Sequence, residues 1–97
     1  THNMAIRSDK QLVQWILDKG YTVSVYDTEE LAITRGMELV DIIDAIDAVG
    51  MAELVFFNGE ERVGWALVID HGPGHEEEFV SDYSVTPTMT EWEQTQG

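Results

Sequence analysis

Two stretches of the 97-residue chain carry apolar residues at helical spacing, and each is followed by segments rich in β-type residues. The first stretch begins at Ser8 with a capping-box pattern and ends at Gly20, a residue type favoured just after a helix. The second begins at residue 36 or 37 and ends at Gly50. Its apolar face, at a repeat of 3.6 residues, is predicted to hold Leu39, Ile42, Ile43, Ile46 and Val49. This pattern limits the chain to folds that bury one face of each helix against a sheet.

Five segments have the composition of strands, at residues 21–26, 31–34, 54–57, 62–69 and 79–85. Asn58-Gly59 predicts a two-residue hairpin turn of type I′, because both residues accept a positive φ. A second capping box at Thr88 opens a short final helix. We therefore predict an α+β fold in the order α-β-β-α-β-β-(β)-α. It would have a four- to five-stranded antiparallel sheet with the two main helices on one face.

The length favours one domain over residues 1–97, and the 43% apolar content is enough for a buried core. Residues 1–3, which precede Met4, look like remnants of an expression vector. The chain has no cysteine, which excludes disulfides and thiolate metal sites. We find no apolar run of membrane-spanning length and no signal-peptide pattern, so we expect a cytoplasmic protein.

Nineteen acidic residues against five Lys and Arg give the chain a formal charge of −14 at pH 7. Such a surface repels phosphates, and five cations cannot support direct binding of nucleic acid. We therefore expect a basic protein as the partner, and neither nucleic acid nor a membrane.

Four of the acids recur every third residue along the second predicted helix, opposite its apolar face. We call this row the acidic stripe; it consists of Glu38, Asp41, Asp44 and Asp47. Asp47 falls in the last turn, where the helix dipole disfavours an anion by about 0.3–1 kcal/mol. Two interpretations stay open: a solvated helix face, or a row of phosphate-like charges presented to a cationic groove. A metal site is a weaker interpretation, because such a row winds around the helix and does not converge on one ion.

The segment between the last two predicted strands contains two histidines and three consecutive glutamates, which invites a metal-site hypothesis. His71 and His75 are permissible ligands, but the Gly-Pro-Gly between them offers no rigid spacing and no fourth ligand is evident. We interpret the segment as a polar connection whose Glu76, Glu77 and Glu78 extend the anionic surface. No nucleophile and base occur in a catalytic pattern, so we expect no enzyme activity, cofactor or metal.

Phe56 and Phe57 are adjacent in a predicted strand, so their rings must point to opposite faces of the sheet. If the helices cover one face, one ring is exposed or is covered by another element. Trp92 of the final helix could fold over that second face. Alternatively, the face could serve self-association in a homodimer.

Residues 62–69, with a glycine-containing loop and residues 80–84 after them, resemble small uncharacterised proteins encoded by phages, prophages and plasmids. Residues 21–27 add to the resemblance, which covers about half of the chain, whereas the longer loop at residues 71–78 departs from it. The resemblance implies no activity of its own. It implies a mobile-element origin, and such elements encode small acidic DNA mimics that block restriction or CRISPR machinery.

We therefore expect a non-enzymatic inhibitor of mobile-element origin that mimics nucleic-acid phosphates and occludes a basic protein surface. The partner-binding residues would be Glu38, Asp41, Asp44, Asp47, Glu76, Glu77 and Glu78. The alternatives are an immunity or antitoxin-like protein, a structural homodimer, or a metal-binding protein that uses the histidines and glutamates. The sequence does not identify the partner or the host process. It also leaves open whether carboxylates from separate segments form one patch.

Overall fold

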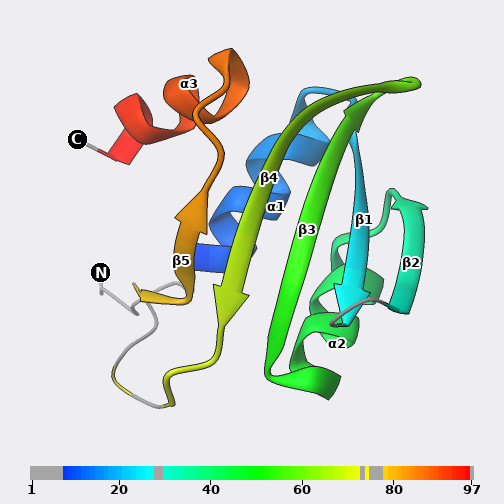
Figure 1. Cartoon of the computed structure of the whole chain (residues 1–97), viewed down its shortest axis with the longest axis vertical. Coiled ribbons are helices and arrows are strands. Elements are labelled where there is room, and N and C mark those ends of the chain that lie inside the picture. The colour runs from blue at the N-terminus through cyan, green and yellow to red at the C-terminus, as the bar shows by residue number, and fades with distance from the viewer. Residues whose placement is uncertain (1–7, 28–29, 73, 75–77, 97) are drawn as a thin grey trace.

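The computed structural model describes residues 8–27, 30–72, 74 and 78–96, and confirms the predicted order of helices and strands. Its elements are α1 (Ser8–Asp18), β1 (Thr22–Asp27), β2 (Glu30–Gly36), α2 (Leu39–Val49), β3 (Met51–Asn58), β4 (Glu61–Ile69), β5 (Val80–Tyr83) and α3 (Pro87–Gln96). The strands form one antiparallel sheet in the order β2-β1-β3-β4-β5 (Figure 1).

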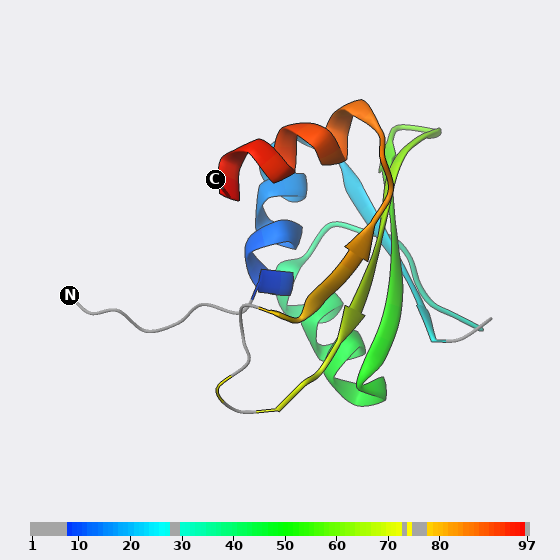
Figure 2. The same ribbon diagram turned by 60° about the vertical axis from the view of Figure 1, so that its left-hand side comes forward.

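All three helices lie on one face of this sheet, as Figure 2 shows in a side view. α1 packs on β1, α2 packs on β1, β2 and β3, and α3 packs on β4 beside α1. The predicted sheet with two main helices on one face is therefore confirmed. No helix in the described part of the chain is long and apolar enough to cross a membrane.

The hydrophobic core fills the space between the helices and the sheet. Alternate residues of β3 reach it, because successive side chains of a strand point to opposite faces. Its fully buried members include Leu12, Ile16, Val25, Ile42, Leu54 and Phe56. Burial of each such side chain stabilises the fold by about 1.5–3 kcal/mol.

The ends of α1 and α2 are set by glycines with positive φ, as the sequence predicts. At Gly20 (φ 83°) the backbone N–H donates to Leu17 O, and the next N–H, of Tyr21, donates to Ile16 O. These two bonds form a Schellman motif, which satisfies carbonyls that the helix end leaves open. Gly50 (φ 75°) ends α2 in the same left-handed conformation.

The start of α2 differs from the prediction, because the preceding strand is longer than expected. β2 continues to Gly36, which pairs with Val23, and the helix begins at Leu39 after Glu38 as N-cap. A Cβ at Gly36 would lie 2.7 Å from Cγ2 of Ile33 in the same strand, so any other residue here would require that side chain to shift.

The β3–β4 turn is also shifted by one residue from the predicted Asn58-Gly59. Asn58 pairs with Glu61 as part of the ladder, and the two turn residues are Gly59 and Glu60. Only the first of these has a positive φ, 64° at Gly59. That arrangement is typical of a type II′ turn rather than type I′.

α3 begins two residues before the predicted start, at Pro87, and its cap is Thr86 rather than Thr88. The Thr86 hydroxyl donates to Val63 O at 3.0 Å and accepts a long bond of 3.5 Å from Met89 N. Proline suits the first helical position, because the N–H it lacks has no partner within the helix there.

The expectation that Trp92 covers the second face of the sheet is wrong. Trp92 is 5% exposed and packs on the helix face, with its ring centroid 5.7 Å from that of Trp15. The ammonium of Lys19 lies 4.5 Å from the Trp15 ring centroid and pairs with Glu91, which ties α3 to α1.

Candidate partner-binding surface

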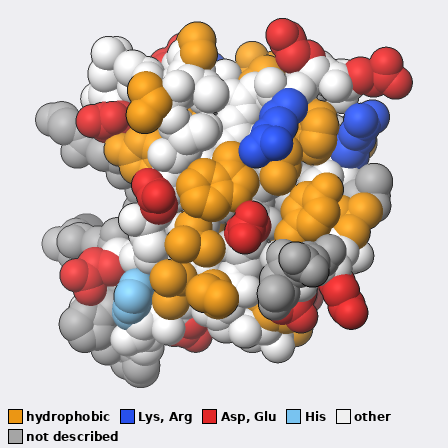
Figure 3. Space-filling model, in the orientation of Figure 1, with side chains coloured by type: hydrophobic (Ala, Val, Ile, Leu, Met, Phe, Trp, Pro, Cys, Tyr) orange, Lys and Arg blue, Asp and Glu red, His pale blue; other side chains and the backbone are white. Residues whose placement is uncertain are grey.

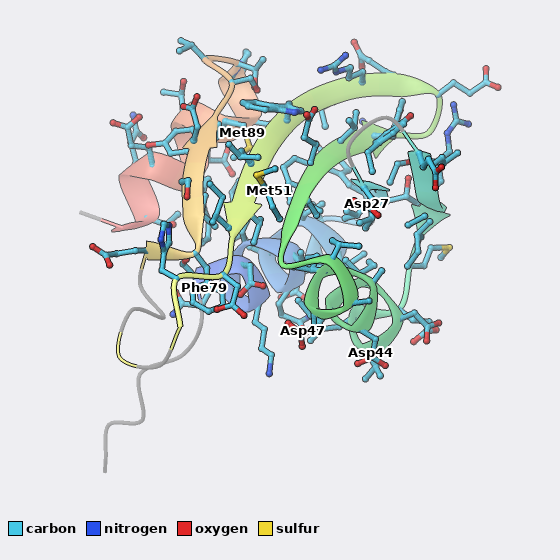
Figure 4. The ribbon with its side chains drawn as sticks, turned by 60° about the horizontal axis from the view of Figure 1, so that its bottom comes forward. Asp27, Asp44, Asp47, Met51, Phe79 and Met89 are labelled. Atoms are coloured by element: carbon cyan, nitrogen blue, oxygen red, sulfur yellow. The ribbon has the colours of Figure 1, made fainter. Side chains whose placement is uncertain are left out.

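The acidic stripe lies on the solvent side of α2 because the other side of the helix is required by the core. Ile42, Ile43 and Ile46 are buried, whereas all four stripe residues are exposed. Asp44 and Asp47 project from α2 away from the sheet (Figure 4). From Glu38 to Asp47 the row spans about 13.5 Å at 1.5 Å per residue.

The helix places the members of the stripe in unequal electrostatic environments. Glu38 is the N-cap residue, in an extended conformation, and Asp41 lies in the first turn, where the helix dipole favours anions. Asp47 lies in the last turn, where no basic residue of the helix compensates it. Within the described part of the chain, the side chains of Glu38, Asp41 and Asp44 make no hydrogen bond or ion pair.

One cation from another element approaches the stripe. Lys10 of α1 and Asp44 line the same shallow hollow between α1 and α2, together with Leu39, Val40 and Ile43. Their side chains are not within ion-pair distance. The hollow places an apolar patch directly beside the stripe, since Val40 is 69% exposed.

Two backbone hydrogen bonds extend the anionic surface beyond α2. Asp70 N donates to Gly50 O at 2.8 Å, which places this aspartate at the end of the helix that carries the stripe. Ile69 N donates to Phe79 O at 2.8 Å, which brings Glu78 to the same end of the sheet. Both carboxylates are exposed. The sequence reasoning missed Asp70, because only the long-range pairing after β4 places it there.

Only some of the other predicted site residues of this region lie in the part of the chain that the structure describes. Glu76, Glu77 and His75 lie outside the described residues. His71 is exposed, and its Nε2 lies 3.3 Å from Ser81 Oγ. In the described residues, no group of three or more His, Cys, Asp or Glu side chains is placed to hold a metal ion.

The face of the sheet opposite the helices carries a second surface, which we call the open face. Phe56 points into the core and Phe57 to the open face, as the sequence predicts. Figure 3 views this face and shows apolar side chains gathered across it. The indole N–H of Trp65 donates to Glu53 Oε2 at 3.2 Å, and the guanidinium of Arg35 lies 4.7 Å from the Phe57 ring centroid.

Tyr83 lies away from both surfaces, where β5 meets α3. Burial raises the pKa of its phenol above the usual value of 10.0, and the neighbouring Glu93 carboxylate, which accepts its hydrogen bond, raises the pKa further. Tyr83 therefore stays neutral at physiological pH.

The sequence matches no protein-family model and no curated protein, and the fold matches no solved structure. The resemblance to small mobile-element proteins therefore stays a prediction. The proposal about function therefore depends on the chemistry of the acidic surface.

Proposed function

We propose that this protein is a non-enzymatic inhibitor that uses the acidic stripe to occupy a basic, nucleic-acid-binding surface of another protein. The observation that carries the proposal is the exposure of all four stripe carboxylates, three on the solvent side of α2 and the fourth, Glu38, at its N-cap. Three of them have no partner within the described residues and are therefore available to cations of a partner.

The arrangement supports mimicry of phosphates because both the spacing and the rigidity are suitable. Side chains three residues apart on a helix have Cβ atoms about 5–6 Å apart, which resembles the spacing of phosphates along one strand. α2 is anchored by its buried isoleucines, so the backbone that carries the carboxylates is in place before binding. Pre-ordered charges lose little conformational entropy on association.

The mechanism is competitive occlusion of a nucleic-acid channel. The charge of −14 attracts a basic protein from beyond contact distance and raises the association rate. Carboxylates of the stripe then replace phosphates as partners of Lys and Arg. Asp70 and Glu78 lie at the same end of the molecule and would lengthen the contact.

The test compares two variants with the same net charge. Asp41→Asn/Asp44→Asn/Asp47→Asn removes three charges from the stripe, and Glu30→Gln/Glu60→Gln/Glu61→Gln removes three exposed charges elsewhere. Each immobilised protein is exposed to a nuclease-treated bacterial lysate and eluted with a salt gradient. Captured proteins are then assayed for binding of a labelled DNA duplex, with the soluble test protein as competitor.

We expect the wild-type protein and the control variant to retain a DNA-binding protein and to displace its duplex, and the stripe variant to fail at both. Equal loss in the two variants would mean that net charge alone matters, and the stripe would then be a solvated face. A captured protein that does not bind nucleic acid would contradict mimicry and favour the antitoxin-like alternative.

A further inference from the structure

We propose that the open face is a self-association surface, on which a second copy of this chain packs sheet against sheet in a two-fold dimer. The proposal does not depend on the function proposed above, because the acidic stripe is carried by α2, which lies on the other face of the sheet (Figure 2).

The open face is apolar and is not covered by any described element. Phe57, Trp65 and Leu67 are only partly buried and do not belong to the core that the helices cover. Two further apolar side chains are about half exposed, Leu31 at 47% and Met51 at 51%. Val55, in the middle, is 8% exposed, so its strand neighbours already shield it. Apolar side chains that remain accessible together on one face are typical of an interaction site.

The charge balance of the open face selects a second copy over a cationic partner. The strand register and the Phe57 contact direct four charged side chains of the described strands to this face: Arg35, Arg62, Glu53 and Asp82. Their formal charges cancel, whereas the chain as a whole carries −14. A basic protein would instead bind the acidic surface on the helix side of the sheet. The open face is the surface on which electrostatic repulsion between two copies of this acidic chain is weakest.

The positions of these charges are also self-complementary. Arg62 lies beside Phe57 in the register, and the guanidinium of Arg35 stacks on the same ring, so both cations lie toward the β3–β4 turn. Glu53 and Asp82 both pair with Leu67, and Glu53 precedes Phe57 by four residues in β3, away from the turn. A two-fold axis perpendicular to the strands near Val55 and Trp65 therefore places the cationic end of one copy over the acidic end of the other. An isologous interface requires this kind of self-complementarity.

The area is sufficient for a dimer of moderate affinity. The five strands contain 34 residues. At about 3.3 Å per residue and about 4.8 Å between strands they cover roughly 540 Å² of flat sheet, to which side-chain relief adds. Specific interfaces begin at about 600 Å² per partner. We therefore expect a dissociation constant in the micromolar range.

The experiment is analytical ultracentrifugation of the full chain over a range of concentrations up to about 500 µM. The mass should rise from 10.9 kDa toward twice that value. Trp65→Asp places a charge beside the two-fold axis, where it faces the same charge of the second copy, and should weaken dimerisation at least tenfold. Val40→Asp, on an exposed apolar residue of α2, adds the same charge elsewhere and should leave the dimer intact. Circular dichroism checks that each variant is folded. Met51→Lys, which places a cation over the cationic end of the other copy, is a second probe of the same face and should also weaken the dimer.

The response to salt separates this proposal from the function proposed above. Two copies of charge −14 repel each other, and added salt screens that repulsion, so the dimer should become tighter as salt rises. Binding of a basic partner through the stripe should become weaker. The triple Asp→Asn stripe variant should dimerise at least as tightly as wild type.

A wild-type protein that stays at 10.9 kDa throughout would overturn the self-association proposal and leave the inhibitor proposal standing. Equal weakening by Trp65→Asp and Val40→Asp would also overturn it. Assembly that continues beyond two copies would contradict the closed two-fold arrangement.

Discussion

Replacement of Trp92 by alanine should be among the most damaging single substitutions in this chain. α3 is a ten-residue helix in which Met89 and Trp92 are buried. Its other described side chains are partly or fully exposed. A tryptophan buries about 150–250 Å², which at about 25 cal/mol per Å² corresponds to roughly 4–6 kcal/mol. The tilted contact with Trp15 contributes about 0.5–1.5 kcal/mol more. Measured losses for Trp→Ala in protein cores are about 3–5 kcal/mol, and we expect about 4 kcal/mol here.

Urea unfolding, followed by circular dichroism, measures this loss directly. A domain of this size has a free energy of unfolding of about 5–15 kcal/mol, so the variant should retain a fold with much reduced stability. At about 4–8 °C per kcal/mol, the Tm should fall by roughly 15–30 °C. Val85→Ala, at a side chain that is 97% exposed, is the control and should change stability by less than about 0.5 kcal/mol. A loss below about 1 kcal/mol for Trp92→Ala would show that α3 is not docked as described.

Three further substitutions test single contacts. Thr22→Val should stabilise the fold by about 1 kcal/mol in urea unfolding, because the buried Thr22 hydroxyl has no hydrogen-bond partner in the described part of the chain. Destabilisation would mean that the hydroxyl is satisfied. Thr86→Ala should cost about 1–2 kcal/mol in the same assay, because it removes the cap of α3 and the bond to Val63 O; an unchanged midpoint would contradict this role. The pKa of Tyr83 is higher in the folded than in the unfolded chain, so its contribution to stability should be constant below about pH 10 and should be lost as pH rises above it. Tyr83→Phe should flatten that decline in a pH series of thermal melts, and an unchanged slope would contradict the assignment.

The helices and strands could be predicted from the sequence where local signals were sufficient. Gly20 and Gly50 end helices through their own conformational freedom, and the isoleucine spacing of α2 identifies its buried face. The same spacing placed the acidic stripe on the solvent side without reference to any other element. These features depend on neighbours a few residues away, which a sequence displays directly.

The errors arose where partners distant in sequence decide the outcome. The sequence alone places a helix start near Gly36. In the structure Gly36 pairs with Val23 and is the last residue of β2. Trp92 was assigned to the wrong face, because its position depends on Trp15 in a helix at the other end of the chain. The place of Asp70 beside α2 depends on one backbone bond to Gly50. No local pattern contains these pairings.

The irregular margins of the sheet have a consequence for how this protein avoids fibrous aggregation. The ladder between β1 and β3 runs in register through five pairs, but the ladders of the two outer strands are interrupted by register shifts. β5 is four residues long, and β2 contains Arg35 with a φ of 47°, which distorts its outer edge. The outer edges therefore offer no straight row of backbone N–H and C=O groups to which a strand of another molecule could be added. The molecule can expose an apolar sheet face because its irregular edge strands prevent other molecules from extending the sheet by strand addition.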